Sequence, residues 1–173
     1  KKPLIAIIPD GIIPERFNGA MDYAKHIDSF IWSSAPDRGL KELLELWPSI
    51  KSNWPDAELR ILYGWEYYDK WTVNNEMREF KAKIIKLCKQ PGVTWVGRVS
   101  QSKIAEEFIA ADYWLYPPHS FRETCCITAL ECQAAMVLCF YRRNGALPET
   151  IGKRGIGLSP EDTGDKIINK IKN

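Results

Sequence analysis

The sequence predicts a single α/β domain over residues 1–173, built on a Rossmann-like parallel sheet flanked by helices. Two observations support this prediction: short apolar runs alternate with amphipathic helical patterns, and the runs are apolar almost throughout. Strands of this composition are buried on both faces of a parallel sheet, and the helices between them form the crossovers. At 173 residues the chain can bury enough apolar surface to fold as one domain.

The expected elements follow one another in a regular order. Strands are expected at residues 4–8, 29–32, 59–63, 93–96, 113–116 and 137–141. Helices are expected at residues 40–50, 77–88, 124–135 and 162–173, and a further helix should follow Ser100, a typical N-cap residue. Pro48 should kink or restart the first helix, and residues 66–75 are predicted to be the longest irregular segment.

Composition and charge exclude several classes of protein. The formal net charge of +2, from 24 basic and 22 acidic side chains, argues against nucleic acid as the main partner. The sequence has no apolar stretch long enough to span a membrane and no recognisable signal peptide, so a cytoplasmic location is expected. Because a strand-like run opens the chain directly, the domain is expected to come from a longer protein.

The five cysteines are interpreted as small buried side chains in a reducing compartment. Four of them fall within residues 125–139, they form no CxxC pair, and the only histidines are His26 and His119. This pattern fits neither a disulfide framework nor a zinc site. No metal site is therefore expected.

The segment from Ser120 to Glu131 is the first candidate site, because it follows a predicted strand and opens a predicted helix. Free N–H groups of the first helical turn, at residues 125–127, favour a phosphate together with the helix dipole. Glu123 precedes this turn, and Glu131 lies about 12 Å further along a continuous helix. A sugar, a diphosphate and a ribose in a row have a comparable length.

Glu131 occupies an unusual position for a carboxylate. It lies four residues after the first member of the stripe expected to face inward, which consists of Ile127, Leu130 and Ala134. A carboxylate on a semi-buried face needs a partner. The hydroxyl groups of a ribose could donate to its two oxygens, or it could form an internal ion pair with Arg142 or Arg143.

Two other strand-to-helix turns are candidates. Arg38 could place a guanidinium on a phosphate, and Gly39 would let the backbone approach a ligand closely, although a solvated arginine at a helix start is the alternative. Residues 97–100 form another turn of this kind. The aromatic side chains after the third strand could stack on a base or sugar, although local packing is favoured; they are Trp65, Tyr67, Tyr68 and Trp71.

Several segments, taken in order, are similar to motifs of one enzyme family. Residues 8–12 (IPDGI) resemble its IPNGI/V segment at an interdomain cleft, and residues 33–43 resemble its GR…KG loop. Glu123 and Glu131 reproduce its E-x7-E spacing, and residues 145–149 (GALPE) resemble its GGxPE turn. Over essentially its whole length the chain thus resembles the C-terminal, nucleotide-sugar-binding half of retaining glycosyltransferases of the GT-B fold, in glycosyltransferase family 4.

The resemblance implies roles for particular residues. Glu123 would be the catalytic candidate that contacts the transferred sugar, and Glu131 would hold the ribose hydroxyls. Backbone amides of Cys126 and Ile127 would bind the diphosphate, Arg38 would take the place of the family lysine that pairs with phosphate, and backbone around Arg98 and Val99 would read the base. The remaining donor-binding candidates are Ser33, Gly39, Thr124 and Cys125.

The resemblance also implies a reaction and partners. A hexose-type sugar would pass from a UDP- or GDP-linked donor to a glycan, lipid or protein-linked acceptor with retained anomeric configuration. No metal or other cofactor would take part. The acceptor pocket would lie on an N-terminal domain that this chain lacks, and the full-length enzyme would be cytoplasmic, with a peripheral location at the membrane.

The chain departs from the family pattern at several positions. Ser33 stands where the family has an arginine, which leaves one phosphate cation fewer, and Asp10 replaces an asparagine at the cleft. Cys125 and Cys126 replace a glycine-rich turn, and Met136 replaces a helix-ending glycine. Because fold alone does not fix function, a non-catalytic nucleotide- or phosphate-binding module and a plain interaction domain remain as alternatives.

Overall fold

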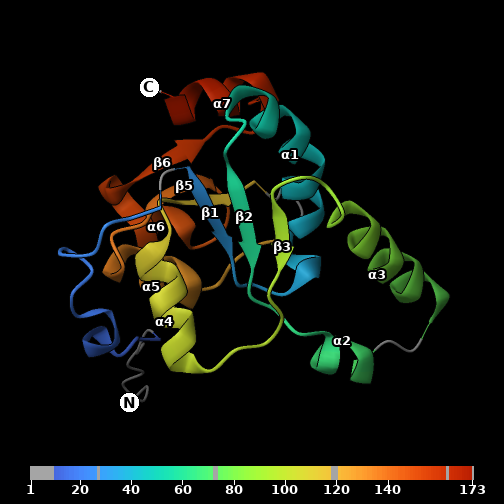
Figure 1. Ribbon diagram of the computed structural model, residues 1–173, viewed down its shortest axis with the longest axis horizontal. Coiled ribbons are helices and arrows are strands. Elements are labelled where there is room, and N and C mark those ends of the chain that lie inside the picture. Colours follow the sequence, from blue (N-terminus) through green and yellow to red (C-terminus); the bar gives the residue numbers. More distant parts are fainter. Residues whose placement is uncertain (1–9, 27, 72–73, 118–120, 163, 173) are drawn as a thin grey trace, which may run out of the picture.

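In the computed structural model, six parallel strands form one sheet in the order β3-β2-β1-β4-β5-β6, with helices on both faces (Figure 1). The structure describes residues 10–172 except 27, 72–73, 118–120 and 163. The predicted Rossmann-like α/β fold is therefore confirmed. The strand expected at residues 4–8 lies outside the described residues.

The elements have the following bounds. The strands are β1 (Ser29–Trp32), β2 (Glu58–Ile61), β3 (Val93–Trp95), β4 (Tyr113–Tyr116), β5 (Leu138–Arg142) and β6 (Gly155–Leu158). The α-helices are α1 (Leu40–Asn53), α2 (Trp65–Trp71), α3 (Asn75–Leu87), α4 (Gln101–Ala110), α5 (Ile127–Ala134), α6 (Leu147–Ile151) and α7 (Gly164–Lys172). Three short 3-10 turns are η1 (Pro14–Phe17), η2 (Pro36–Arg38) and η3 (Gly152–Arg154).

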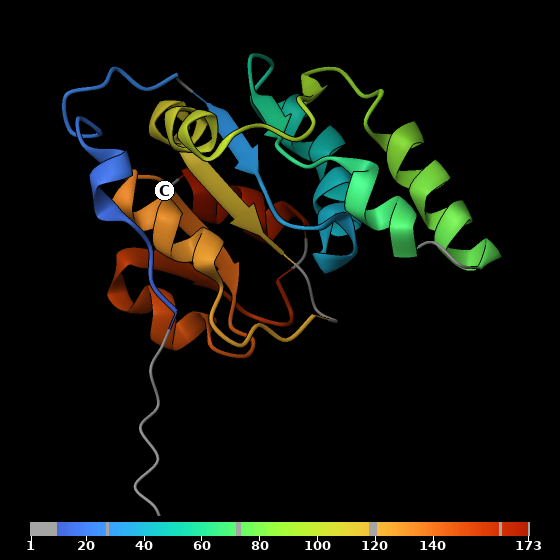
Figure 2. The ribbon, with the colours of Figure 1, turned by 90° about the horizontal axis from the view of Figure 1, so that it is seen from below.

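The helices form two layers around the sheet. On one face α1 packs against α3 and α7, and on the other α5 packs against α4, α6 and η1. Figure 2 shows α4 and α5 (yellow and orange) on the opposite side of the sheet from α1 and α3. The central strands β1 and β4 are therefore covered on both faces, which explains their continuous apolar composition.

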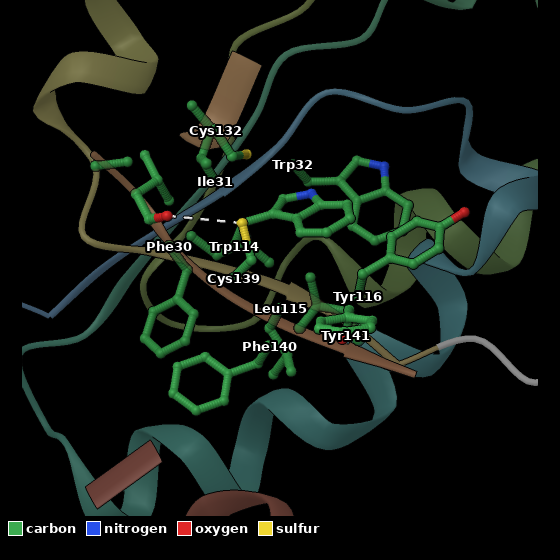
Figure 3. Packing of buried hydrophobic residues seen from close by; sticks show 14 of the residues in the cluster. Phe30, Ile31, Trp32, Trp114, Leu115, Tyr116, Cys132, Cys139, Phe140 and Tyr141 are labelled. Carbon is green, nitrogen blue, oxygen red and sulfur yellow. Dashed lines mark hydrogen bonds between the residues drawn. The ribbon is translucent and has the colours of Figure 1, made fainter. Parts of the chain in front are cut away.

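The core lies around the three central strands β1, β4 and β5 (Figure 3). The rings of Trp32 and Trp114 both stack on Tyr116, with centroid distances of 5.4 and 4.8 Å. Cys132 and Cys139 are fully buried among these residues and are free thiols. The interpretation of the cysteines as buried side chains is confirmed for these two and for Cys126, whereas Cys88 and Cys125 are half-buried.

Two of the sequence-based expectations about helices were wrong. Residues 65–71 are not irregular but form α2. α1 continues through Pro48, whose ring removes the N–H that would bond to the carbonyl of Leu44. The side-chain amide of Gln90 donates to that carbonyl at 2.9 Å, so the acceptor is satisfied and the helix need not end there.

The sequence also gave no indication of α6 or β6. β6 contains two glycines in four residues, a composition that is depleted in strands. Packing requires glycine at position 155, because a Cβ there would lie 2.7 Å from the carbonyl oxygen of Cys139 on β5. A short glycine-containing strand of this kind has no recognisable apolar pattern.

Met136, where the resemblance places a glycine, has the left-handed conformation that glycine favours, with φ of 61°. The amides of Met136 and Val137 donate to the carbonyls of Gln133 and Cys132, which is the Schellman arrangement at the end of α5. The Met136 side chain is 55% exposed, so little packing is lost when it is removed. We expect Met136→Gly to raise the free energy of unfolding by about 1 kcal/mol, measured by chemical denaturation.

The control for this prediction is Met21→Gly, at an exposed methionine without positive φ. That change should be neutral or destabilising, because glycine only adds freedom to the unfolded chain there. A similar gain in both variants would contradict the assignment of backbone strain to Met136.

Glu107 of α4 fastens that helix to β2 through a two-point contact with Arg60. Its oxygens accept from Arg60 Nε at 2.6 Å and Nη2 at 2.9 Å. The hydrogen bond to Arg60 lowers the pKa of the Glu107 carboxyl, despite burial. This contribution to stability is present above the ordinary carboxyl pKa and is lost as the pH falls through the lowered folded-state pKa.

We therefore expect Glu107→Gln to cost about 1 kcal/mol at neutral pH, a modest value because Arg60 is partly exposed to water. The difference from the wild type should shrink as the pH is lowered below about 4. Denaturation at a series of pH values measures it. The exposed neighbour Glu106 serves as the control, since Glu106→Gln should cost little at any pH. A pH-independent difference for Glu107→Gln would contradict the prediction.

Candidate functional site

The order of the strands places a crevice between β1 and β4. The chain proceeds outward in opposite directions from this pair, so the loops after β1 and β4 separate and leave a cleft at the carboxyl ends of the strands. A cavity of about 320 Å³ lies there. Its lining comes from three segments: Asp10, then Ser34, Ala35 and Arg38 after β1, and residues 123–128 after β4.

Six of the site residues proposed from the sequence line this cavity, namely Arg38, Glu123, Thr124, Cys125, Cys126 and Ile127. The others lie outside its lining: Ser33, Gly39, Arg98, Val99 and Glu131. Sequence reasoning did not single out Ser34, Ala35 or Thr128 as site residues. The serine and threonine are close to each other, with hydroxyl oxygens 3.4 Å apart. No motif marked them, although they border residues that motifs did mark.

A larger cavity of about 580 Å³ lies between α4 and the first residues of β1 and β2. Four of the charged side chains along it already pair with one another: Arg60 with Glu107, and Lys103 with Glu106. It is also remote from the carboxyl ends of the strands, where parallel sheets bind ligands. We therefore place the functional site in the smaller cavity.

The helix at the cavity begins three residues later than expected, at Ile127. Cys126 precedes it in the left-handed conformation, with φ of 65°, and interrupts the helical path. Glu123 is therefore not on the helix, and the continuous helix that was expected to join it to Glu131 is absent. Ile127 and Thr128 supply first-turn N–H groups that lack partners within a helix and carry its positive dipole end.

Glu123 is buried, with only 4% of its surface exposed, and is held by two side chains. The hydroxyl of Tyr116 donates to Glu123 Oε1 at 2.6 Å, and Arg38 Nη1 lies 3.8 Å from Oε2. Burial, and then the hydrogen bond to this carboxylate, raises the pKa of Tyr116 well above its usual range. Arg38 also lies over the ring of Phe121, at 4.5 Å from its centroid, so it is ordered rather than freely solvated.

Residues 144–150 hold the loop that carries Glu123. The amide of Ala146 donates to the carbonyl of Glu123 at 2.9 Å, and the side chain of Asn144 donates to the carbonyl of Phe121 at 2.9 Å. The hydroxyl of Thr150 donates to the carbonyl of Cys125 at 2.8 Å. The GALPE segment and the residues on either side of it therefore hold the backbone of this loop through hydrogen bonds to its carbonyl groups.

Removal of the Tyr116 hydroxyl should destabilise the domain. Tyr116→Phe keeps the ring stack but leaves the Glu123 carboxylate buried with only Arg38 nearby. We expect the free energy of unfolding to fall by about 2 kcal/mol in chemical denaturation, a typical value for a lost hydrogen bond to a buried charge.

The control is Tyr141→Phe, because Tyr141 is also a largely buried strand tyrosine and its hydroxyl has no hydrogen-bond partner among the described residues. It should change stability by less than about 0.5 kcal/mol. Equal losses in the two variants would mean that the hydroxyl of Tyr116 does not stabilise Glu123.

Glu131 is buried as expected, but its surroundings differ from the expectation. Its partner is Arg16 of η1, with Nη1 3.2 Å from Oε1, and not Arg142 or Arg143. Arg142 donates to the carbonyl of Ser159 instead. Burial raises the pKa of the Glu131 carboxyl, and the charge of Arg16 opposes this rise.

The inward face of α5 was also assigned incorrectly. Ile127 is 46% exposed, whereas Ala129 and Cys132 are fully buried. The helix was expected to begin at residue 124 but begins at Ile127, so the expected helical positions of the inward-facing residues were not correct. Glu131 follows Thr128 by three residues, so it lies one turn further along the helix on the same side.

The remaining candidate residues lie at neighbouring strand ends. Gly39 ends η2 in the left-handed conformation, with φ of 112°, and precedes α1. Arg98 packs against Gly64, where an added Cβ would lie 2.8 Å from the Arg98 Cβ. Trp65 stacks on Trp95 at 4.9 Å. It also contacts Tyr68 edge-on at 5.2 Å, so local packing holds for these two; the Tyr67 and Trp71 side chains lie outside the described set.

Neither a metal cluster nor a membrane span emerges from the described part of the chain. No group of three or more histidine, cysteine, aspartate or glutamate side chains is close enough there to bind a metal ion. None of the helices described is sufficiently long and apolar to cross a bilayer.

The fold is a Rossmann-like α/β domain with a cavity at its topological switch point. The model of the glycosyl transferases group 1 family matches residues 23–172, and the chain belongs to this family. Among curated proteins, no sequence matches significantly.

Solved structures of glycosyltransferases share the fold. Sucrose-phosphate synthase from Thermosynechococcus elongatus superposes with a TM-score of 0.70 at 19% identity, over 95% of this chain and 42% of that one. The trehalose-6-phosphate protein from E. coli gives 0.70 at 11% identity, over 94% and 42%. The C-terminal domain of a glycosyl transferase group 1 family protein from Francisella tularensis gives 0.60 at 17% identity, over 95% and 82%. The chain thus spans less than half the length of the first two.

Proposed function

We propose that this domain binds the nucleotide-sugar donor of a retaining, family 4-type glycosyltransferase and forms its C-terminal half. The observation that carries the proposal is the convergence of the α5 N-terminus, Arg38 and the buried Glu123 on one cavity between β1 and β4. A positive helix end and a guanidinium favour a diphosphate. A buried carboxylate beside them suits a contact with the sugar.

Each part of the site then has a task. The backbone amides of Cys126 and Ile127, with Arg38, would hold the diphosphate and stabilise the negative charge that develops as it leaves. Glu123 would contact the transferred hexose. Glu131 would accept hydrogen bonds from the ribose hydroxyls, and backbone at Arg98 and Val99 would contact the base. We propose that no metal is needed, because the helix end and Arg38 supply the positive charge.

The other partners follow from the length of the relatives. The chain covers 42% of sucrose-phosphate synthase but 82% of a domain described as C-terminal, which supports an N-terminal domain of the same enzyme as the missing partner. We propose that this domain supplies the pocket for a carbohydrate, lipid-linked or protein-linked acceptor. The E. coli neighbour is described as bound with UDP-2-fluoro glucose, which favours a UDP- or GDP-linked donor here.

Isothermal calorimetry tests the donor site directly. The 173-residue chain is titrated with UDP, GDP and ADP and with the matching nucleosides. At least one diphosphate should bind, and about tenfold more tightly than its nucleoside if the helix end and Arg38 hold the phosphates. Failure of all three diphosphates at millimolar concentration would reject the proposal, and equal affinity for nucleoside and diphosphate would reject the phosphate site.

A non-catalytic nucleotide- or phosphate-binding module is the second candidate. One observation favours it over a transferase: Arg38 is the one cation among the described residues that line the cavity, and Ser33 supplies no second one, so little side-chain charge is available to stabilise a departing diphosphate. The two functions differ in turnover. When the preceding half of the enzyme is present, donor hydrolysis that Glu123→Ala abolishes supports the transferase, whereas binding without turnover supports the module.

A further inference from the structure

Arg16 contacts two helices, α5 and α4, at residues that lie outside the lining of the cavity. Its Nη1 donates to Glu131 Oε1 on α5 at 3.2 Å, and its Nη2 donates to the carbonyl of Gln101, the first residue of α4, at 2.6 Å. η1 packs on both helices, and Figure 2 shows it (blue) beside α5. The guanidinium therefore sets the separation between the Glu131 carboxylate and the start of α4.

The two oxygens of Glu131 have different surroundings. Oε1 accepts from Arg16, whereas Oε2 accepts no hydrogen bond from any residue that the structure describes. The side chain remains 12% exposed, so water and ligands can reach it. Because each carboxylate oxygen can accept about two hydrogen bonds, a diol can bind here while Arg16 stays in place.

We propose that Arg16 is a positioning residue for recognition of the ribose. It holds Glu131 by one oxygen so that the other is presented to the hydroxyls, and it ties that carboxylate to α4, which follows Arg98 and Val99 directly. This inference rests on the proposed function, because it assigns Arg16 a task at the nucleoside end of that same site.

The charge of Arg16 also favours the ionised form of Glu131. Burial raises the pKa of the Glu131 carboxyl, and Arg16 is the cation that opposes the rise. An ionised carboxylate only accepts, which suits two hydroxyl donors, whereas a protonated one loses part of that capacity.

The other titratable groups around α5 leave this task to Arg16. Cys132, next to Glu131 on α5, is a buried thiol whose own pKa is raised by burial. Lys25 donates to the carbonyls of Ala111 and Ala135. The charged groups on the packed elements are Lys103, Glu106 and Glu107 on α4, Arg142 on β5, Glu149 on α6 and Glu15 on η1, and among the described residues none of these forms an ion pair with Glu131.

Ribose discrimination tests the proposal. Affinities for UDP, GDP or ADP and for the matching 2′-deoxynucleoside diphosphate are measured by calorimetry on the wild type, Arg16→Met and Arg16→Lys. The wild type should prefer the ribose form by about tenfold, and Arg16→Met should reduce this preference to about threefold or less. Arg16→Lys, which keeps a cation, should recover part of it. Arg78→Met removes an exposed arginine on α3 and should leave the preference unchanged.

A pH series separates positioning from a purely structural role. In Arg16→Met the Glu131 carboxyl pKa should move further upward, as read by carboxyl NMR without any ligand. The ratio of this variant's nucleotide affinity to that of the wild type should then fall as the pH is lowered, because Glu131 becomes protonated at a higher pH in the variant. Arg16→Gln gives the same comparison if Arg16→Met does not fold.

The outcomes distinguish this inference from the function on which it rests. If the wild type binds none of the three nucleotides, the proposed function fails and this inference fails with it. If the wild type discriminates and the Arg16 variants do so equally, the proposed function stands and the inference is overturned. Tighter binding by Arg16→Met would also overturn it, because Arg16 would then compete with the ligand for Glu131.

Discussion

Gly145→Ala should destabilise the domain by about 3 kcal/mol or more and abolish nucleotide binding. An added Cβ would lie 2.1 Å from the carbonyl oxygen of Glu123 and 2.8 Å from its nitrogen, and both separations are too short for a non-bonded contact of a Cβ atom. The obstacle is backbone, so it cannot rotate away, and Gly145 also has a positive φ of 59°. The loop that carries Glu123 must therefore shift. Chemical denaturation and calorimetry measure the two effects.

Gly19→Ala is the matched control for this prediction. Gly19 has a positive φ of 88° as well, but nothing lies within 4 Å of an added Cβ. Its substitution should cost only the conformational strain, about 1 kcal/mol, and leave nucleotide affinity intact. If the two alanine variants lost equal stability, the close approach of Gly145 to Glu123 would not be the cause.

Glu131→Ala should weaken binding of the nucleoside diphosphate by about tenfold to a hundredfold, more than Arg38→Ala does. It removes an acceptor for two ribose hydroxyls at a site that is largely shielded from water. The side chain of Arg38 is 45% exposed, so its charge is screened and contributes less. Calorimetry with UDP, GDP and ADP gives both values.

Salt separates the two contributions further. The loss caused by Arg38→Ala should shrink between about 0.05 and 0.5 M salt, because exposed charges are screened over that range, whereas the loss caused by Glu131→Ala should persist. Glu131→Gln serves as a control because glutamine fills the space that alanine leaves empty. Like alanine, it removes the negative charge opposite Arg16. A larger effect of Arg38→Ala at all salt concentrations would contradict the assignment of Glu131 to the ribose.

The fold was predictable because its strands are buried on both faces. β1 and β4 have the bounds expected from their apolar runs, Ser29–Trp32 and Tyr113–Tyr116. Ser100 caps α4 as expected, accepting from the amide of Lys103. Elements whose stability depends on a distant partner were not visible: the continuation of α1 through Pro48 needs Gln90, forty-two residues later in the chain.

The site was predictable where it is local and not where it depends on contacts between distant segments. Residues 123–127 line the cavity because they directly follow β4, which the sequence identifies. The sequence suggested Arg142 or Arg143 as alternative ion-pair partners of Glu131, but Arg16 reaches it across 115 positions of sequence. The Tyr116 hydroxyl bond to Glu123 was not anticipated either, because a strand tyrosine gives no sign of which way its hydroxyl points.

The distribution of the cysteines provides a reporter for the cavity without any mutation. Burial raises the thiol pKa of Cys88 to about 11 and of Cys126 to about 12, and raises that of Cys132 as well. Cys139 is fully buried, whereas Cys125 is half-buried and lines the cavity. Because the thiolate is the reactive form, a mild alkylating reagent at neutral pH should modify Cys125 first. The rate of that modification would then measure how much of the protein has a ligand bound.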